Sequence, residues 1–395
     1  MGSLWHGMTM SQHNLMQNPM LKAGIIAIGK RNMAQTAPDT PLIPLAEAKR
    51  FISECLQAVG APKKHADAMG DLLVAADRRG HMSHGMNRLE MFVNDIRSGN
   101  CDPKAVPKIL KETVATAWVD GQNGLGVVIG DFCMGTAIKK AKEVGIGIAA
   151  AKGSNHYGIS SRYNFQAVKE GLLGMNFTNT SPFLAPTRSK KAFFGTNPIA
   201  LAAPGKEGDK FVLDVSTTAV SYGKIEIARR KGIPIPEGWA QDKDGRTTTD
   251  TNIAMAPTSC LMPLGGSETN SGYKGYGLAF IVEIFAGILS GATYGPNIKR
   301  WLSTERVADL GQCFIAINPK CFAPGFEDRL SDLMNAIRKS EPADPAKPVV
   351  VPGDIEKQQA IAVDKAGGVR YIANQMETCK RLSEQLKVKP LRGQP

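Results

Sequence analysis

A strand-like run, TVATAWV (residues 113–119), is followed by FCMGTAIKKAKEV (132–144), whose apolar residues recur at helical spacing, and by GIAAA (147–151), which again has the composition of a strand. The alternation continues with a helical segment at Tyr163–Glu170 and a strand at Leu173–Thr178. Strands that alternate with helices in this way are typical of a mixed α/β sheet. The middle of the chain therefore predicts an α/β fold.

Amphipathic helical segments precede and follow this α/β region. They are Leu45–Val59, His65–Ala76 and Leu89–Ile96 on the N-terminal side, and Glu327–Lys339 and Ile355–Lys387 on the C-terminal side. The last segment has a break at Gly367-Gly368. Because an amphipathic helix must bury its apolar face against another element, we expect the N-terminal and C-terminal helices to pack together as one layer beside the α/β centre.

The charge balance favours small anions as ligands. The chain has 395 residues, with 48 lysines and arginines against 36 acidic residues, so its net charge is +12. A basic surface attracts anions. The basic residues are dispersed, and neither a zinc-finger spacing nor an aromatic RNA-binding motif is present, so we expect no nucleic-acid partner. No apolar run reaches the roughly 18–20 residues that span a bilayer, so we expect no membrane partner.

The cysteines and the N-terminus bear on location. Seven cysteines, an odd number without a Cys-x-x-Cys pair, indicate free thiols in a reducing compartment, and we expect a cytoplasmic protein. Residues 1–38 contain no acidic residue and include Lys22, Lys30 and Arg31. For residues 1–41 two alternatives stay open, namely a mitochondrial targeting segment and a disordered N-terminal extension.

Two histidines and three arginines fall within eleven residues, Arg78–Arg88. His84 and Arg88 stand four apart, so a helix would place both side chains on one face. An imidazole exchanges a proton near neutral pH, and a guanidinium can bind a carboxylate through two parallel hydrogen bonds. The segment therefore predicts a site for a 2-hydroxy or 2-oxo acid. The alternative is a solvated, basic start of a helix.

Another histidine, His156, lies in the sequence GSNHYG (153–158), directly after the strand predicted at Gly147–Ala151. Catalytic side chains are common in loops at the ends of strands. His156 is therefore a candidate catalytic residue. A loop histidine that only bonds its neighbours is the alternative.

Two further clusters are candidates for binding an anionic cofactor. Asp214 ends an apolar strand and could accept hydrogen bonds from ribose hydroxyls, and Ser216 and Thr217 could contact phosphate oxygens; a helix N-cap is the alternative. Lys274 lies between glycines just before a helix predicted at Tyr276–Leu289. A lysine and a helix N-terminus together favour an anion, although the same residues also suit a simple turn.

Three common types of site are not supported. Gly124, Gly126 and Gly130 have Gly-x-Gly-x-x-x-Gly spacing, one residue too long for the Rossmann dinucleotide fingerprint, so we expect them to permit close helix–strand packing instead. His81 and His84 lack a third metal ligand at a suitable spacing, and we expect no metal site. No Gly-x-Ser-x-Gly motif marks a serine nucleophile.

Taken together, the clusters resemble the second type of the malate/L-lactate dehydrogenase family, which includes ureidoglycolate, sulfolactate and malate dehydrogenases and a cyclic-imine reductase. The resemblance runs from about residue 42 to about residue 368. The matching motifs are, in chain order, Arg79–Gly85 with Arg88, Asn155–Gly158, Phe194–Pro198, Gly223-Lys224, Gly232–Pro234, Gly238-Trp239, Gly272–Leu278 with Glu283 and Gly291, and Gly311-Gln312.

The resemblance implies a fold that is not Rossmann-like, an NAD or NADP cofactor and a homodimer. It implies a proton donor at His156 and a substrate pocket formed by Ser83, His84 and Arg88. The positions that match cofactor contacts are Thr180, Asp214, Val215, Ser216 and Lys274. We also expect a helical, substrate-binding and dimer-forming part at 42–120 and 300–388, and an α/β NAD(P)-binding part at 121–299.

The predicted reaction is reversible hydride transfer between NAD(P) and a small 2-hydroxy acid of the malate or L-lactate type. Arg88 would hold the substrate carboxylate, and His156 would accept the hydroxyl proton during oxidation and return it during reduction. His84 would orient the substrate oxygen or serve as the alternative acid. Phe92 stands where many family members carry tyrosine, which leaves the second substituent of the acid open. The alternatives are a reductase of a cyclic 2-imino acid and a non-catalytic anion-binding relative.

Overall fold

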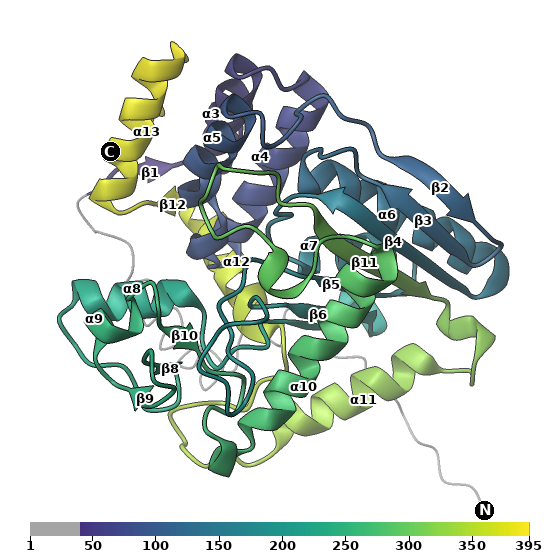
Figure 1. Cartoon of the computed structure of the whole chain (residues 1–395). Helices are drawn as coiled ribbons and strands as arrows, with labels where there is room; N and C mark the ends of the chain where they lie inside the picture. The colour runs from purple at the N-terminus through teal and green to yellow at the C-terminus, as the bar shows by residue number, and fades with distance from the viewer. Residues whose placement is uncertain (1–39, 395) are drawn as a thin grey trace, which may run out of the picture.

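A seven-stranded mixed sheet forms the centre of the computed structural model, which describes residues 40–394 (Figure 1). In spatial order its strands are β2 (Lys108–Glu112), β3 (Thr116–Asp120), β4 (Ile146–Ser154), β11 (Leu310–Ile317), β5 (Leu173–Thr178), β6 (Ile199–Pro204) and β7 (Lys210–Val215). Only β3 and β4 pair in parallel, and the helix between them provides the crossover that parallel strands need. The prediction of a mixed α/β fold is confirmed, and β5 has the bounds expected from the sequence.

Helices cover both faces of the sheet. The elements on one face are α6 (Gly126–Val144) and α7 (Ser161–Lys169), and those on the other are α10 (Gly272–Glu283) and the π-helical turn Ile284–Ile288. Successive side chains of a strand point to opposite faces. Accordingly Phe314 of β11 packs in the cluster beneath α6, whereas its neighbour Ile315 packs in the cluster beneath α10 and the π turn.

Gly126 brings the start of α6 against the loop that carries His156. A Cβ atom on Gly126 would lie 2.3 Å from the carbonyl oxygen of Asn155 and 2.5 Å from that of His156, so no larger residue fits. The prediction that this glycine cluster permits close packing is confirmed. The helix begins six residues before the predicted start at Phe132, because the glycines belong to the helix rather than to a preceding loop.

With the exception of the helix at Phe326–Lys339, which was expected here but contributes no residue to the shared apolar cluster, the N-terminal and C-terminal helices form one layer, as predicted. They are α3 (Leu45–Ala58), α4 (Lys63–Arg78), α5 (Leu89–Arg97), α12 (Asp354–Ala366) and α13 (Ala373–Leu386). Leu56 of α3, Leu73 of α4 and Leu382 of α13 belong to the same buried apolar cluster. The break predicted at Gly367-Gly368 separates α12 from a short ribbon in which β12 (Val369–Arg370) pairs with β1 (Leu42–Ile43).

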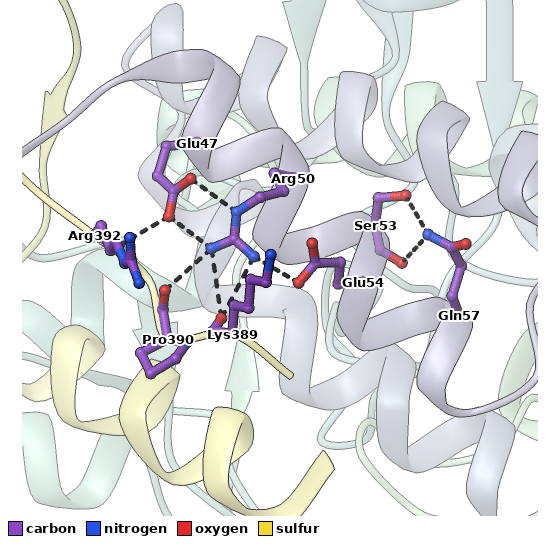
Figure 2. Close-up of polar contacts among 8 residues, drawn as sticks. All are labelled: Glu47, Arg50, Ser53, Glu54, Gln57, Lys389, Pro390 and Arg392. Atoms are coloured by element: carbon purple, nitrogen blue, oxygen red, sulfur yellow. Dashed lines mark hydrogen bonds and ion pairs between the residues drawn. The ribbon is translucent and has the colours of Figure 1, made fainter. Parts of the chain in front are cut away.

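Polar contacts also join α3 to the C-terminal tail (Figure 2). The Arg50 guanidinium donates to Glu47 Oε1 at 2.6 Å and, through the same nitrogen, to the carbonyl oxygen of Pro390 at 3.1 Å. The backbone N–H of Arg392 donates to Glu47 Oε1 at 2.9 Å. The two ends of the described chain are therefore fastened to each other at one edge of the helical layer.

A smaller lobe lies at the lower left of Figure 1. It contains α8 (Tyr222–Arg230), α9 (Thr251–Ala254) and a three-stranded sheet of β10 (Cys260–Leu261), β8 (Ala240–Gln241) and β9 (Thr247–Thr248). The remaining long helix, α11 (Phe326–Lys339), follows β11 and crosses the lower part of the same view.

The central sheet draws strands from both predicted parts of the chain. β2, β3 and β11 come from the ranges 42–120 and 300–388, which the sequence assigns to the helical part. The division by function stays a prediction, but the sheet itself continues across both boundaries. Residues 1–39, with the predicted targeting or disordered extension, lie outside the described residues. Between residues 40 and 394 no helix is both long and apolar enough to cross a bilayer.

Candidate active site

One large cavity contains nearly all the residues that the sequence singles out. Its volume is about 2090 Å³, against roughly 300–1,000 Å³ for a typical small-ligand site, so a dinucleotide and an acid fit together. The predicted residues that line it are Ser83, His84, Arg88, His156, Thr180, Asp214, Val215 and Ser216. Lys274 is exposed at the start of α10 and is not among the lining residues, so its contact with a cofactor stays a prediction.

The segment between α4 and α5 forms the wall with His84 and Arg88. It consists of two 3-10 turns, Met82–His84 and Met86–Arg88, rather than the single helix face that the spacing suggests. Arg88 Nε donates to the carbonyl oxygen of Ser83 at 2.6 Å, which leaves the two terminal nitrogens of the guanidinium for a ligand. Burial lowers the pKa of Arg88, but an arginine stays charged, so the cavity keeps a cation here.

His156 stands at the centre of a group of rings that come from four segments. Its ring centroid lies 5.8 Å from that of His84, 5.9 Å from that of Phe92 and 5.6 Å from that of Trp301. The Trp301 ring also lies 5.3 Å from the guanidinium carbon of Arg88. The predicted proton donor and the predicted carboxylate-binding guanidinium thus lie next to the same indole ring.

Burial favours the neutral form of both His84 and His156. Burial lowers the pKa of His84 to about 4, with a further contribution from the charge of Arg88. Burial also lowers the pKa of His156 well below 6.5, and the neighbouring His84 and Arg88 act in the same direction. The backbone N–H of Gly158 donates to His156 Nδ1 at 3.2 Å, so the neutral ring carries its proton on Nε2.

Trp301 belongs to a segment that is tied to the helical layer. Lys299 Nζ lies 3.3 Å from Asp95 Oδ1 of α5, and Asn100 donates to the carbonyl oxygen of Thr304 at 2.7 Å. These contacts hold the segment over His156 and Arg88. Trp301 is not among the residues predicted from the sequence, because a lone tryptophan carries no local signal of its contacts with the distant His156 and Arg88.

Asp77, near the end of α4, holds the Met82–Arg88 segment in place. Its side chain is buried, and Oδ2 accepts hydrogen bonds from the backbone N–H of Met86 at 2.9 Å and from the Tyr371 hydroxyl at 2.8 Å. A Cβ on Gly85 would lie 1.7 Å from Asp77 Oδ1, so only glycine fits between the two 3-10 turns. Burial raises the pKa of Asp77 to about 7.

Asp77→Asn is expected to change how stability depends on pH. The unfolded carboxyl titrates near 3.8 and the folded one near 7, so the wild type binds an extra proton only when folded between these values. It therefore loses stability as pH rises from about 4 to about 7. The melting temperature of the variant relative to wild type should rise across that interval and then level off. A difference that stays flat with pH would contradict the shifted ionisation.

Hydroxyl groups and a carboxylate form the other wall of the cavity. Asp214 Oδ2 accepts from the backbone N–H of Ser161 at 2.7 Å, so Asp214 at the end of β7 stabilises the start of the distant helix α7 rather than capping the next helix along the chain. Thr180 Oγ1 accepts from the backbone N–H of Thr196 at 2.9 Å. Thr217, which is buried and does not itself line the cavity, donates through its hydroxyl to the carbonyl oxygen of Thr196 at 3.1 Å. This wall suits the ribose and phosphate groups of a nicotinamide dinucleotide.

The chain matches known proteins along most of its length. The model of the family described as malate/L-lactate dehydrogenase matches residues 43–379. The L-sulfolactate dehydrogenase of Methanocaldococcus jannaschii is 41% identical over 312 residues, which cover 78% of this chain and 88% of that protein. The malate dehydrogenase of Pyrococcus abyssi is 42% identical over 301 residues, which cover 75% of this chain and 82% of that protein.

Cofactors appear in the names of two more distant relatives. A (2R)-3-sulfolactate dehydrogenase (NADP(+)) of Chromohalobacter salexigens is 33% identical over 76% of this chain and 88% of its own length. A ureidoglycolate dehydrogenase (NAD(+)) of Escherichia coli O157:H7 is 31% identical over 79% of this chain and 88% of its own length. Dehydrogenases with such names imply a nicotinamide cofactor for this chain.

Solved structures give the same result. The sulfolactate dehydrogenase of Methanocaldococcus jannaschii superposes with a TM-score of 0.81 at 37% identity, covering 88% of this chain and 98% of that one. The delta1-piperideine-2-carboxylate reductase of Pseudomonas syringae pvar. tomato superposes with a TM-score of 0.77 at 26% identity, covering 87% and 99%. The resemblance drawn from the sequence motifs is therefore confirmed, and the chain belongs to the malate/L-lactate dehydrogenase family of hydroxy acid oxidoreductases.

Proposed function

We propose that the protein transfers a hydride reversibly between NAD(P) and a small 2-hydroxy acid of the malate or L-lactate type. The observation that carries the proposal is the placement of His156 and Arg88 next to the same Trp301 ring in a cavity large enough for a dinucleotide. A bound nicotinamide cofactor would supply the hydride. Thr180, Asp214, Val215 and Ser216 would hold it along the hydroxyl-lined wall.

The residues of the chain divide the remaining work. The terminal nitrogens of Arg88 bind the substrate carboxylate as a pair of parallel donors. His156 Nε2 faces the reacting oxygen, donates a proton to it in reduction and accepts one in oxidation. His84, whose Nδ1 lies 2.8 Å from Ser83 Oγ, keeps that oxygen in line. Phe92 and Trp301 exclude water from the imidazole.

Proton donation requires that substrate binding change the protonation of His156, because the ligand-free ring is neutral. The carboxylate bound by Arg88 offsets the positive charge that contributes to the low pKa. Reduction should then lose kcat/KM as pH rises through a value below 6.5, whereas kcat, which reports the complex, should fall at a higher pH. Initial rates measured from about pH 4 to pH 9 test this. If kcat and kcat/KM fell at the same pH, substrate binding would not change the protonation of His156, and this prediction would be contradicted.

A substrate panel tests the proposed function itself. NADH and NADPH oxidation should be followed with oxaloacetate, pyruvate, 3-sulfopyruvate and piperideine-2-carboxylate. Turnover of a 2-oxo acid supports the proposal. Turnover of the cyclic imine alone would favour an imine reductase. The structural similarity to the piperideine-2-carboxylate reductase supports this second candidate. Failure to bind either nucleotide in a fluorescence titration would instead favour a non-catalytic anion-binding protein.

We also propose a homodimer, built on the exposed side of α10 and the π turn. The apolar residues there include Phe280 at 50%, Ile284 at 44%, Ile288 at 52% and Leu289 at 56% exposure. Contiguous apolar surface of this kind marks an interface. Leu278 and Ile281 of the same helix line the cavity, so a second copy seated here would also close the cavity wall. Light scattering should give twice the chain mass, and Ile284→Glu should reduce it.

A further inference from the structure

Glu283 is a buried carboxylate that no cation accompanies within residues 40–394. It is the last residue of α10, directly before the π turn, and only 2% of its surface is exposed. Its Oε1 accepts from Asn179 Nδ2 and from the backbone N–H of Gly295, each at 3.0 Å, and its Oε2 accepts from Asn197 Nδ2 at 2.7 Å. Three neutral donors thus satisfy a charge that would otherwise be costly to bury.

Each donor belongs to a different loop of the cavity wall. Asn179 directly precedes Thr180, and Asn197 directly follows Thr196. Gly295 directly precedes Pro296. The cavity-lining residues of the three loops are therefore the immediate neighbours of the residues that Glu283 binds, namely Thr180, Thr196 and Pro296. Glu283 itself does not line the cavity, so it has no direct contact with a ligand there.

Asn197 connects Glu283 to Thr180 through hydrogen bonds. Its Nδ2 donates to Glu283 and to the carbonyl oxygen of Ala279 at 3.1 Å, which uses both amide hydrogens. Its Oδ1 is therefore turned toward the backbone N–H of Thr180, from which it accepts at 3.3 Å. Asn197 also has a φ of 33°, in the left-handed region, so its backbone needs such bonds to keep its shape.

We propose that Glu283 is a positioning residue for the cofactor: it acts through Asn179 and Asn197 to fix Thr180 and Thr196 in the geometry that binds NAD(P). The proposal rests on the function proposed above. Binding of the cofactor and binding of the acid would then depend on different parts of the chain, because Arg88 and His156 do not belong to the segments that Glu283 contacts. Loss of Glu283 should weaken the binding of the cofactor more than that of the acid and should leave the proton transfer unchanged.

The test is Glu283→Gln in the full chain. A carboxylate accepts on both oxygens, whereas a glutamine must turn an NH2 group toward one of the three donors, leaving at least one buried N–H without a partner. The Kd for NADH or NADPH, measured by fluorescence titration, should rise about 10-fold or more. The KM for the acid and kcat at saturating cofactor should stay within about threefold. Glu170→Gln, a surface change that removes the same charge, should alter none of these.

Three further variants keep the test decisive. Adding Asn197→Asp to Glu283→Gln supplies an acceptor for the new NH2 group, and part of the lost cofactor affinity should return, whereas Asn197→Asp alone sets two carboxylates against each other and should be worse than either. If Glu283→Gln does not fold, Asn197→Gly removes the same link while suiting the positive φ, and it should also raise the cofactor Kd.

Hydrogen exchange separates the positioning role from the proposed function. The amides of Thr180 and Gly295 are donors in this network, so peptides covering 179–184 and 293–298 should exchange faster in Glu283→Gln, without any ligand added. If the wild type binds no nicotinamide cofactor, the proposed function fails. The exchange data still show whether Glu283 orders the loops that contain Thr180 and Gly295. Unchanged exchange together with an unchanged cofactor Kd in Glu283→Gln would overturn the proposal.

Discussion

His156→Ala is expected to lower kcat for reduction of the preferred 2-oxo acid by about 10²–10⁴-fold, the usual contribution of a general acid. The centroid of the His156 ring lies 5.8 Å from that of His84, 5.9 Å from that of Phe92 and 5.6 Å from that of Trp301, inside the cavity. Loss of the ring removes the proton donor without removing the guanidinium of Arg88. The KM for the acid should therefore change far less than kcat, as steady-state kinetics can show.

The matched control is His65→Ala. His65 Nδ1 lies 2.8 Å from the carbonyl oxygen of Pro103, and the residue does not line the cavity, so kcat should be close to that of wild type. Turnover by His156→Ala within a fewfold of wild type would move the proton donor elsewhere. His84 would be the next candidate, because its ring stacks on that of His156.

Arg88→Lys is expected to raise the KM for the acid by roughly 10- to 100-fold, since a charge-assisted hydrogen bond contributes about 1.5–3 kcal/mol. An ammonium is a point charge and cannot form two parallel bonds to a carboxylate. Lysine would also lose the Nε bond to the carbonyl oxygen of Ser83 and the stacking on Trp301. Isothermal titration with a non-reacting 2-oxo acid analogue in the presence of cofactor measures the binding directly.

Arg97→Lys is the control for this change. Arg97 is exposed at the end of α5, one helix beyond Arg88, and it does not line the cavity. The KM should not respond to it. An Arg88→Lys variant with unaltered KM and kcat would mean that another cation holds the carboxylate, and Arg300 on the same cavity wall would then be the residue to test.

Local signals predicted much of the fold. β5 was predicted from an apolar run between turn residues, and its bounds are those of the structure. β2 was missed because all five of its residues are exposed, so the strand has no buried face to produce an alternating pattern. The π turn at the end of α10 was also missed, because the apolar composition of Tyr276–Leu289 does not distinguish α-helical from π-helical turns.

The candidate site was predicted only where its residues carry a signal in their immediate sequence. His84 and Arg88 are close in sequence, and His156 follows a recognisable strand, so each could be identified from its surroundings. Trp301 and Glu283 depend on contacts between segments more than 80 residues apart, which form only because β11 inserts between β4 and β5. A lone tryptophan and a glutamate inside an apolar helix carry no local signal of such contacts.

The Asp77 contacts set a limit on how specificity can be redesigned. The Met82–Arg88 segment is attached to α4 through Asp77 and to the C-terminal helical layer through Tyr371, and Gly85 leaves no space for a different spacing. A graft of only the seven residues Met82–Arg88 from a relative would therefore lack the matching residues at positions 77 and 371 that hold the segment in place. The segment and its attachments comprise three stretches, including one nearly 300 residues downstream, so a substitution at Tyr371 would act on the Met82–Arg88 segment from outside the cavity.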